Sequence, residues 1–296
     1  MSNSVKKTVT PPAQAEKFGM TNLSFYDDFD SQDTIDVKNT HQPGYNWYVQ
    51  PPFRCPVLSA DELKVEDSVL CYHPSSGGSI FPSYSKMGRT GFTFRYAYAE
   101  ARIRIDVEEQ LNFGELDCWP AFWAHSLTDC LGEHWDRCGE LDIFEAFQLR
   151  SDNEKNTLGK NMVFYNGALH DHVKQPEGIP NVIGSNLVNA TGYNDQFDFV
   201  DNDWHVYGTL LDKGIAEFYM DNKLMHSIRY DQDRLPDYFY RDNPDPLPRI
   251  EHTRPELLSR TFPGAHEIMD RENLVVILQA HEKWPMYVDW VRVWQK

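Results

Sequence analysis

The sequence of 296 residues predicts an all-β domain, a sandwich or barrel of antiparallel strands. Three observations predict it: short runs of β-branched and aromatic residues, alternation of apolar and polar residues with a period of two, and turn signals between the runs. Long helical patterns are nearly absent. The length is normal for one large sandwich, whose core needs neither a disulfide nor a metal for stability.

The expected strands follow one another from Leu23 to the end of the chain. The clearest cover residues 91–98, 101–105, 204–211, 216–220 and 287–294. Each alternates in the way that half-buried antiparallel strands do, with one face packed and the other exposed. We therefore expect residues 21–296 to form a single domain.

Two segments break this pattern. Residues 1–20 are polar, contain Pro11 and Pro12 and show no periodicity, which predicts a flexible N-terminal arm. Residues 231–266 contain six prolines and several arginines, which predicts a long surface insertion. Long loops on sandwiches often border a binding site.

Composition limits the possible partners. The net charge of −17 argues against a nucleic-acid ligand, because such binding needs Lys and Arg to neutralise phosphates. No run of 18 apolar residues is present, so we expect no membrane span. Aromatic residues make up 14% of the chain, an excess that fits both a core and a sugar-binding cleft. A neutral polysaccharide suits this charge and this composition best.

The cysteines give no metal-binding pattern. There are five, an odd number, so at least one is unpaired within the chain, and no C-x-x-C spacing indicates zinc. Cys130 and Cys138 are close enough in sequence to close a short loop as a disulfide, but the sequence does not show that they do.

One segment carries the chemistry. In residues 138–147, CGELDIFEAF, three carboxylates stand among apolar residues: Glu140, Asp142 and Glu145. On a regular strand Glu140 and Asp142 share a face and Glu145 lies on the other, but one extra residue in a β-bulge returns Glu145 to the same face. Bulges are common beside active sites because they re-aim a side chain.

Three carboxylates on one face repel one another unless one is protonated. The arrangement therefore fits a pair with separated pKa values, in which one carboxylate attacks and another donates a proton. In retaining glycosidases the two working carboxyls lie roughly 5–5.5 Å apart. The alternative is that the three carboxylates lie on a solvated strand face or bind calcium. The apolar residues on both sides argue against simple exposure of these carboxylates to solvent.

Several segments resemble glycoside hydrolase family 16, in its β-bulge form. GELDIFE at 139–145 is similar to the E-x-D-x-x-E signature of the family. WPAFW at 119–123 is similar to the family's W-P-A-F-W segment. YAEARIR at 98–104, the paired runs at 203–208 and 216–221, and MYVDWVRVW at 286–294 resemble strands of the family in the right order. The resemblance spans residues 23–296. It implies a β-jelly-roll sandwich of two antiparallel sheets with a concave substrate cleft.

The resemblance also implies roles for individual residues. Glu140 would be the nucleophile, Asp142 its hydrogen-bonding partner, and Glu145 the general acid and base. Substrate contacts would come from the residues at matching positions, each of which also has a structural reading: Trp135, Trp123, Glu100, Arg102, His170, Gln279 and Trp284. Gln279 stands where glucanases often have Asn, a departure from the pattern that bears on the sugar contacts. Glu100 and Arg102 would either line the bottom of the cleft or form a salt bridge with each other on their strand.

Members of this family often carry a structural calcium on the convex face. The matching positions here are Asp28, in the Asp27-Asp28-Phe29 run, and Asp289 on the last strand. Both supply the hard oxygen ligands that calcium prefers. No cofactor is expected for catalysis. We expect an extracellular or periplasmic monomer, although this chain shows no signal peptide.

The leading hypothesis is a retaining, endo-acting glycoside hydrolase of β-1,3- or mixed β-1,3/1,4-glucan. Within enzymes, a galactan hydrolase acting on agar or carrageenan, or a transglycosylase, is the alternative. A non-catalytic glucan-binding protein on the same fold is a third possibility. The presence of all three carboxylates favours an enzyme.

Overall fold

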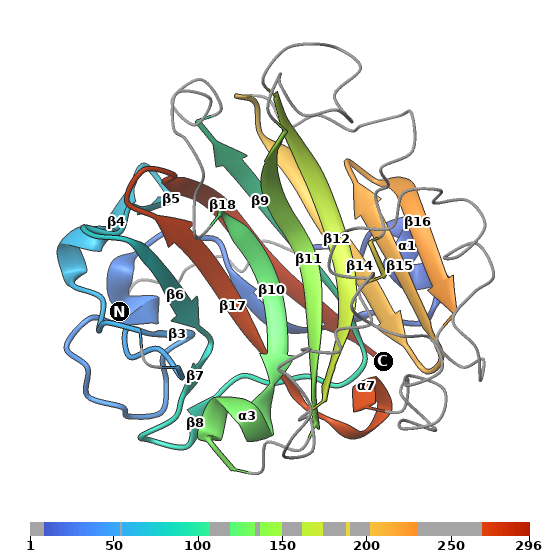
Figure 1. Cartoon of the computed structure of the whole chain (residues 1–296), viewed down its shortest axis with the longest axis horizontal. Coiled ribbons are helices and arrows are strands. Elements are labelled where there is room, and N and C mark those ends of the chain that lie inside the picture. The colour runs from blue at the N-terminus through green and yellow to red at the C-terminus, as the bar shows by residue number, and fades with distance from the viewer. Residues whose placement is uncertain are drawn as a thin grey trace, which may run out of the picture.

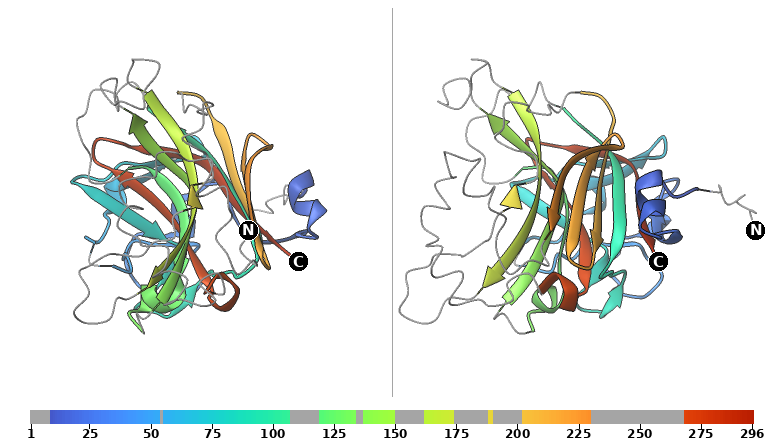
Figure 2. Two further views of the ribbon diagram at one scale, coloured as in Figure 1. Left: turned by 45° about the vertical axis from the view of Figure 1, so that its right-hand side comes forward. Right: turned by 90° about the vertical axis from the view of Figure 1, so that its right-hand side faces the viewer.

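The computed structural model describes residues 9–53, 55–106, 119–133, 137–149, 162–173, 188–189, 202–229 and 268–296. They form two large antiparallel sheets packed face to face, with few and short helices, as Figures 1 and 2 show. This is the jelly-roll sandwich that the family resemblance implies. None of the helices described is long and apolar enough to cross a membrane.

The first sheet contains eight strands. In order across the sheet they are β16 (Lys223–Arg229), β15 (Ile215–Met220), β14 (His205–Asp212), β9 (Ala97–Ile105), β18 (Met286–Gln295), β5 (Val69–Tyr72) and β4 (Leu63–Glu66), with β1 (Asn22–Asp27) also paired to β18. The expected runs at 91–98 and 101–105 differ from this, because residues 97–105 form one continuous strand and residues 92–96 form none. Phe94 instead makes an isolated bridge to Leu274.

The second sheet contains six strands and carries the chemistry. In order they are β13 (Val188–Asn189), β12 (Met162–Val173), β11 (Arg137–Leu149), β10 (Ala121–Ser126), β17 (Leu274–His281) and β6 (Gly78–Pro82). Smaller elements surround the sheets: α1 (Ala13–Lys17), α3 (Leu127–Leu131), α7 (Ile268–Arg271), the 3-10 turns Gln32–Thr34 and Ala60–Glu62, and the short pairs β2 (Ile35–Asp36) with β3 (Trp47–Tyr48) and β7 (Tyr84–Ser85) with β8 (Thr90–Gly91).

Alternation along the strands builds the core between the sheets. On β9, Ala97, Ala99 and Ala101 face the core, and on β10 Phe122 and Ala124 do the same. The residues between them face outward, as the pleat of a strand requires. The outward side of the six-stranded sheet is here called the open face, and it carries its own apolar cluster: Ile80, Ala121, Trp123, Cys130, Val275 and Ile277.

The N-terminal arm was predicted too long. Residues from Ala13 to Met20 pack onto the outward side of the eight-stranded sheet, where Ala15 and Met20 are fully buried beside Tyr98. Gln14 Nε2 donates hydrogen bonds of 2.8 Å to Tyr98 Oη and to Asn222 Oδ1. A five-residue helix is too short to leave a periodic signal in the sequence, which is why the pattern did not reveal it.

Gly208→Ala is expected to destabilise this anchor. A Cβ at position 208 would collide with Tyr98 Oη and lie 2.9 Å from Tyr98 Cζ, in a fully packed region. Overpacking of this kind costs typically about 1–3 kcal/mol. Urea unfolding should report the loss, and adding Tyr98→Phe, which removes the colliding hydroxyl, should recover part of it. Equal stability of Gly208→Ala and the unmodified protein would contradict this packing.

Candidate active site

A β-bulge on β11 brings three carboxylates to the open face. The strand changes register against both neighbours between Asp142 and Glu145. Six positions of β11, from residue 140 to 145, are thereby matched by five on β10 (125 to 121) and five on β12 (170 to 166). Ile143 and Phe144 both turn into the core, and Glu140, Asp142 and Glu145 share one face. The predicted bulge is confirmed.

Glu145 is buried and accepts hydrogen bonds from two donors. Trp119 Nε1 donates to its Oε1 and Asn166 Nδ2 to its Oε2, both at 2.8 Å. Burial raises the pKa of Glu145 to about 8, and the negative charge of Asp142 adds to the shift. His170, Trp119 and Asn166 oppose it. A carboxyl group of this kind stays protonated at neutral pH and is able to donate a proton.

Asp142 lies between the two glutamates in sequence and contacts β12. His170 Nε2 is 2.6 Å from Asp142 Oδ2 and 3.8 Å from Glu140 Oε1. Burial, followed by the charge of Glu140, raises the pKa of Asp142 well above its usual value. Burial and the neighbouring negative charge therefore favour the protonated form of Asp142, as they do that of Glu145.

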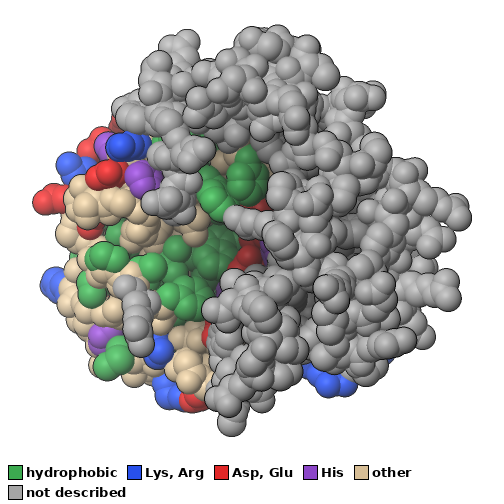
Figure 3. Space-filling view, viewed as in Figure 1, with side chains coloured by type: hydrophobic (Ala, Val, Ile, Leu, Met, Phe, Trp, Pro, Cys, Tyr) green, Lys and Arg blue, Asp and Glu red, His purple; other side chains and the backbone are tan. Residues whose placement is uncertain are grey.

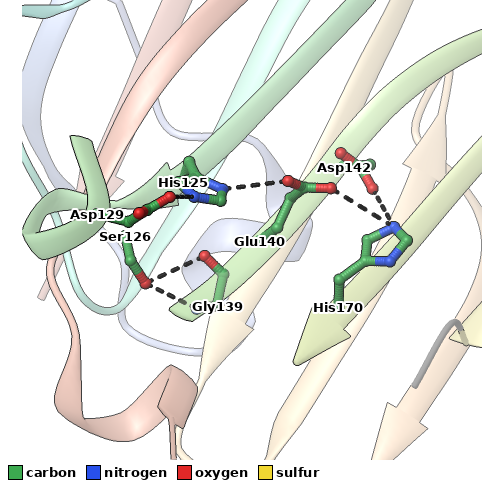
Figure 4. Close-up of polar contacts among 7 residues, drawn as sticks. All are labelled: His125, Ser126, Asp129, Gly139, Glu140, Asp142 and His170. Carbon is green, nitrogen blue, oxygen red and sulfur yellow. Dashed lines mark hydrogen bonds and ion pairs between the residues drawn. The ribbon is translucent and has the colours of Figure 1, made fainter. Parts of the chain in front are cut away.

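Glu140 is the most accessible member, with a side chain that is 19% exposed. On the side away from His170 it meets a second histidine, whose Nδ1 lies 3.1 Å from Glu140 Oε2. The same ring, that of His125, places its Nε2 2.8 Å from Asp129 Oδ2 on α3. Figure 4 shows the resulting row from Asp129 through His125 and Glu140 to His170 and Asp142.

Apolar and aromatic side chains border these groups. Trp123 is 9% exposed on the open face, and Phe53 stacks on it with ring centroids 6.4 Å apart. A hollow of about 510 Å³ begins beside Phe53 and is lined in part by Lys86 and Asp129. Figure 3 shows acidic side chains next to hydrophobic ones in this view.

The structure brings part of the predicted substrate set together. Trp123, His170 and Gln279 all lie on the open face, and Gln279 is paired in register with Ala121, which is itself paired with Glu145. Gln279 Nε2 donates to the carbonyl oxygen of Trp119 at 3.0 Å. Trp135 and the insertion 231–266, with its arginines, lie outside the described residues.

Three predicted substrate residues lie elsewhere, and these predictions are wrong. Glu100 and Arg102 belong to β9 of the opposite sheet and face outward there, because the alternating alanines take the core side. Arg102 pairs with Asp289 rather than with Glu100. Trp284 is 1% exposed within the core between the sheets, so it offers no face to a sugar.

The positions predicted for calcium do not fit that ion. Asp28 pairs with Arg292 at 2.9 Å, and Asp289 pairs with Arg102. A guanidinium on each carboxylate competes directly with a cation. No group of metal-ligand atoms found in the described parts of the chain contains either aspartate.

Two other groups hold three ligand-type atoms within 4.8 Å of one another: His125, Asp129 and Cys138, and Glu140, Asp142 and His170. In both, the histidine already lies at hydrogen-bonding or ion-pair distance from a carboxylate, which accounts for the arrangement without an ion. Cys130 and Cys138 are free thiols, so the short-loop disulfide does not form in this structure.

Sequence reasoning missed several groups of the site. His125 stands two residues after Trp123 and four after Ala121, so alternation alone places it on their face. Asn166 stands four residues before His170 and shares its face for the same reason. Asp129 carried no comparable signal, because a turn into α3 brings it back toward His125.

No model of a known protein family matches the sequence, and no curated protein matches it either. Solved structures do match. One is an endo-acting O-glycanase from the human gut microbiota, described as initiating mucin breakdown: its TM-score is 0.54, its identity 16%, and the match covers 93% of this chain and 100% of that one. The chain shares its fold with this glycanase.

Two further structures overlap with lower scores. The laminarinase catalytic domain from Thermotoga maritima MSB8 has a TM-score of 0.49 at 16% identity, covering 93% of this chain and 98% of that one. The β-porphyranase from Bacteroides plebeius has a TM-score of 0.48 at 17% identity, covering 91% and 89%. At such identities fold likeness does not fix the chemistry. The reaction has to be argued from the site.

Proposed function

We propose that the chain is a retaining, endo-acting glycoside hydrolase of family 16 that cleaves β-linked polysaccharide. The single observation that carries this is the bulge on β11, which puts an accessible Glu140 and a buried, protonated Glu145 on one face of one strand. Two carboxyl groups with different protonation states are what double displacement requires. The sequence motif and the shared glycanase fold support the same proposal.

In the proposed reaction, Glu140 attacks the anomeric carbon while Glu145 gives its proton to the departing glycosidic oxygen. The resulting glycosyl ester on Glu140 is then cleaved by water, from which Glu145, now ionised, takes a proton. Trp119 and Asn166 would stabilise the ionised form, because each donates to one oxygen of Glu145. His170, itself paired with Asp142, would restrain the Oε1 side of the Glu140 carboxylate.

The proposed substrate is a neutral β-1,3- or mixed β-1,3/1,4-glucan. The net charge of −17 disfavours the approach of an anionic chain. Apolar rings beside the site suit the flat faces of a sugar.

The mechanism predicts a β-configured first product from a β-linked chain. A panel of laminarin, mixed-linkage glucan, agarose, carrageenan, porphyran and mucin-type O-glycan, followed by proton NMR of the fresh product, tests substrate and stereochemistry together. Glucan cleavage into oligosaccharides with an initial β-anomer is expected. An α-anomer would rule out Glu140 as the nucleophile. Cleavage of only the galactans or the O-glycan would overturn the assignment of a glucan substrate. Transfer products without hydrolysis would indicate a transglycosylase.

Trp123→Ala is expected to weaken glucan binding by an amount on the order of 1 kcal/mol, since an aromatic face contributes about that much. Its ring stacks with Phe53 and packs at a 70° angle against His125, so Trp123→Phe is the matched variant that keeps an aromatic face. Calorimetry with a glucan oligosaccharide in the Glu140→Gln background measures the effect without turnover. If Trp123→Ala and Trp123→Phe bind the oligosaccharide equally well, Trp123 does not belong to the substrate-binding surface.

A further inference from the structure

We propose that His125, held by Asp129, is a positioning residue for Glu140, and that it acts as an imidazolium that occupies Oε2 and leaves Oε1 to attack the sugar. The proposal rests on the glycosidase function above and adds to it a charged pair that the three-carboxylate motif does not contain.

Each nitrogen of this ring faces a carboxylate oxygen. Nδ1 lies 3.1 Å from Glu140 Oε2, and Nε2 lies 2.8 Å from Asp129 Oδ2. Ionised carboxylates only accept hydrogen bonds, and a neutral imidazole has one N–H. With both carboxylates ionised, both nitrogens must donate, so the ring is positively charged.

The ring has little freedom to leave this position. His125 is 4% exposed and packs edge-on against Phe53 and Trp123, at centroid distances of 5.3 and 5.7 Å. Asp129 follows four residues later on α3, which begins directly after β10. The chain therefore turns back at once to bring the second carboxylate to the ring. Packing and hydrogen bonds together hold the imidazole in one orientation.

The charges around His125 favour its protonated form. From β11 it faces Glu140, Cys138 and Asp142, and from α3 it faces Asp129 and Cys130. Its register partner on β17 is the apolar Val275, and His170 lies beyond Glu140 on β12. Burial alone would lower the pKa of His125, but hydrogen bonds to Asp129, Cys138 and Glu140 outweigh it and raise that pKa well above its usual value.

Two consequences for Glu140 follow. A cation at Oε2 favours the ionised form of this carboxylate, which is the form that attacks. The same contact fixes the rotation of the carboxylate, so that Oε1 lies on the side of His170, 3.8 Å from its Nε2. In the ester, Oε2 would remain the carbonyl oxygen beside His125, where the developing charge of the departing carboxylate is stabilised during hydrolysis.

The test compares the pH dependence of kcat/KM in three variants and a control. His125→Leu removes the donor and the charge, His125→Gln retains a neutral donor, and Asp129→Asn removes only the counter-charge. Glu133→Gln is the control, since it makes the same acid-to-amide change just after α3 at a side chain paired with Arg89. Activity is followed on the best polysaccharide of the panel.

The acidic limb, which reports ionisation of Glu140, is expected to move upward by about one pH unit or more in His125→Leu, because an adjacent opposite charge lowers a carboxyl pKa by about that much. His125→Gln should recover part of kcat but retain the shifted limb, and Asp129→Asn should move the limb in the same direction by less. The control should match the unmodified enzyme.

Nitrogen NMR of the histidine rings supplies a readout that does not depend on activity. It should show both nitrogens of His125 protonated at pH 7, and a lowered pKa of this ring in Asp129→Asn. A neutral ring at pH 7, or a fall in kcat with an unmoved acidic limb and no advantage of Gln over Leu, would overturn the positioning role. The proposed function would survive that outcome, because it is tested separately, by the activity of Glu140→Gln and Glu145→Gln and by the anomeric configuration of the first product.

Discussion

Glu140→Gln and Glu145→Gln are each expected to lower turnover of the best polysaccharide substrate by about 10³-fold or more while the protein stays folded. The first removes the nucleophile, and the second removes a general acid whose contribution is typically about 10²–10⁴-fold. Both side chains lie on the open face and neither contributes to the core cluster, so the substitutions leave the apolar packing intact. Circular dichroism and thermal unfolding monitor folding.

Azide separates the two roles. With an activated aryl glycoside, Glu145→Ala should be rescued by azide to give the β-glycosyl azide, because azide replaces the water that Glu145 would activate. Glu140→Ala should give the α-glycosyl azide by direct displacement. Glu66→Gln, at an exposed position of β4 in the other sheet, is the matched control and should retain full activity. Interchanged azide products would reverse the two assignments.

The second large effect is the loss of activity in base. Burial raises the pKa of Glu145 to about 8, and this group must be protonated to serve as the acid. As pH rises through about 8, kcat/KM should therefore fall, reaching roughly a hundredth of its plateau two units higher. Initial rates across pH 5–10 measure the limb, and far-UV dichroism at each pH must show a folded protein, since the buried Glu100, with a pKa raised to about 7, also ionises in this range.

Trp119→Phe identifies the group behind that limb. Trp119 Nε1 donates to Glu145 Oε1 and so stabilises the ionised carboxylate. Its removal should move the basic limb to higher pH, whereas an increase in water access alone would move it to lower pH. Trp290→Phe, on β18 in the other sheet, makes the same change far from the site and should leave the limb in place. An unmoved limb in Trp119→Phe would assign it to another group.

The sequence predicted the sandwich because alternation is a local property that survives into the structure. β14, β15 and β18 lie close to the runs expected at 204–211, 216–220 and 287–294. The bulge was also predictable, since three carboxylates five residues apart from first to last share a face only if one extra residue is inserted. Strand alternation together with the spacing of the acids therefore located the centre of the site.

The wrong predictions of substrate residues arose where the position of a side chain depended on contacts with residues distant in sequence. The family resemblance placed Glu100 and Arg102 in the cleft, and alternation along their strand does not tell which of the two sheets the strand joins. Small alanines took the core side of β9 and left the charged residues to the outside. Similarly, nothing local distinguishes a Trp that lines a cleft from Trp284, which fills the centre of the core.

The bulge on β11 also bears on how such a site is written in a sequence. Deleting one of the two residues that both point inward, Ile143 or Phe144, would restore strict alternation and place the acid four positions after Glu140, still on the same face of the strand. The same spatial arrangement of carboxylates can therefore be encoded by two sequence motifs, E-x-D-x-x-E with the extra residue and E-x-D-x-E without it. The interval between the two glutamates therefore reports the local backbone geometry, and the two motifs differ by one inserted residue.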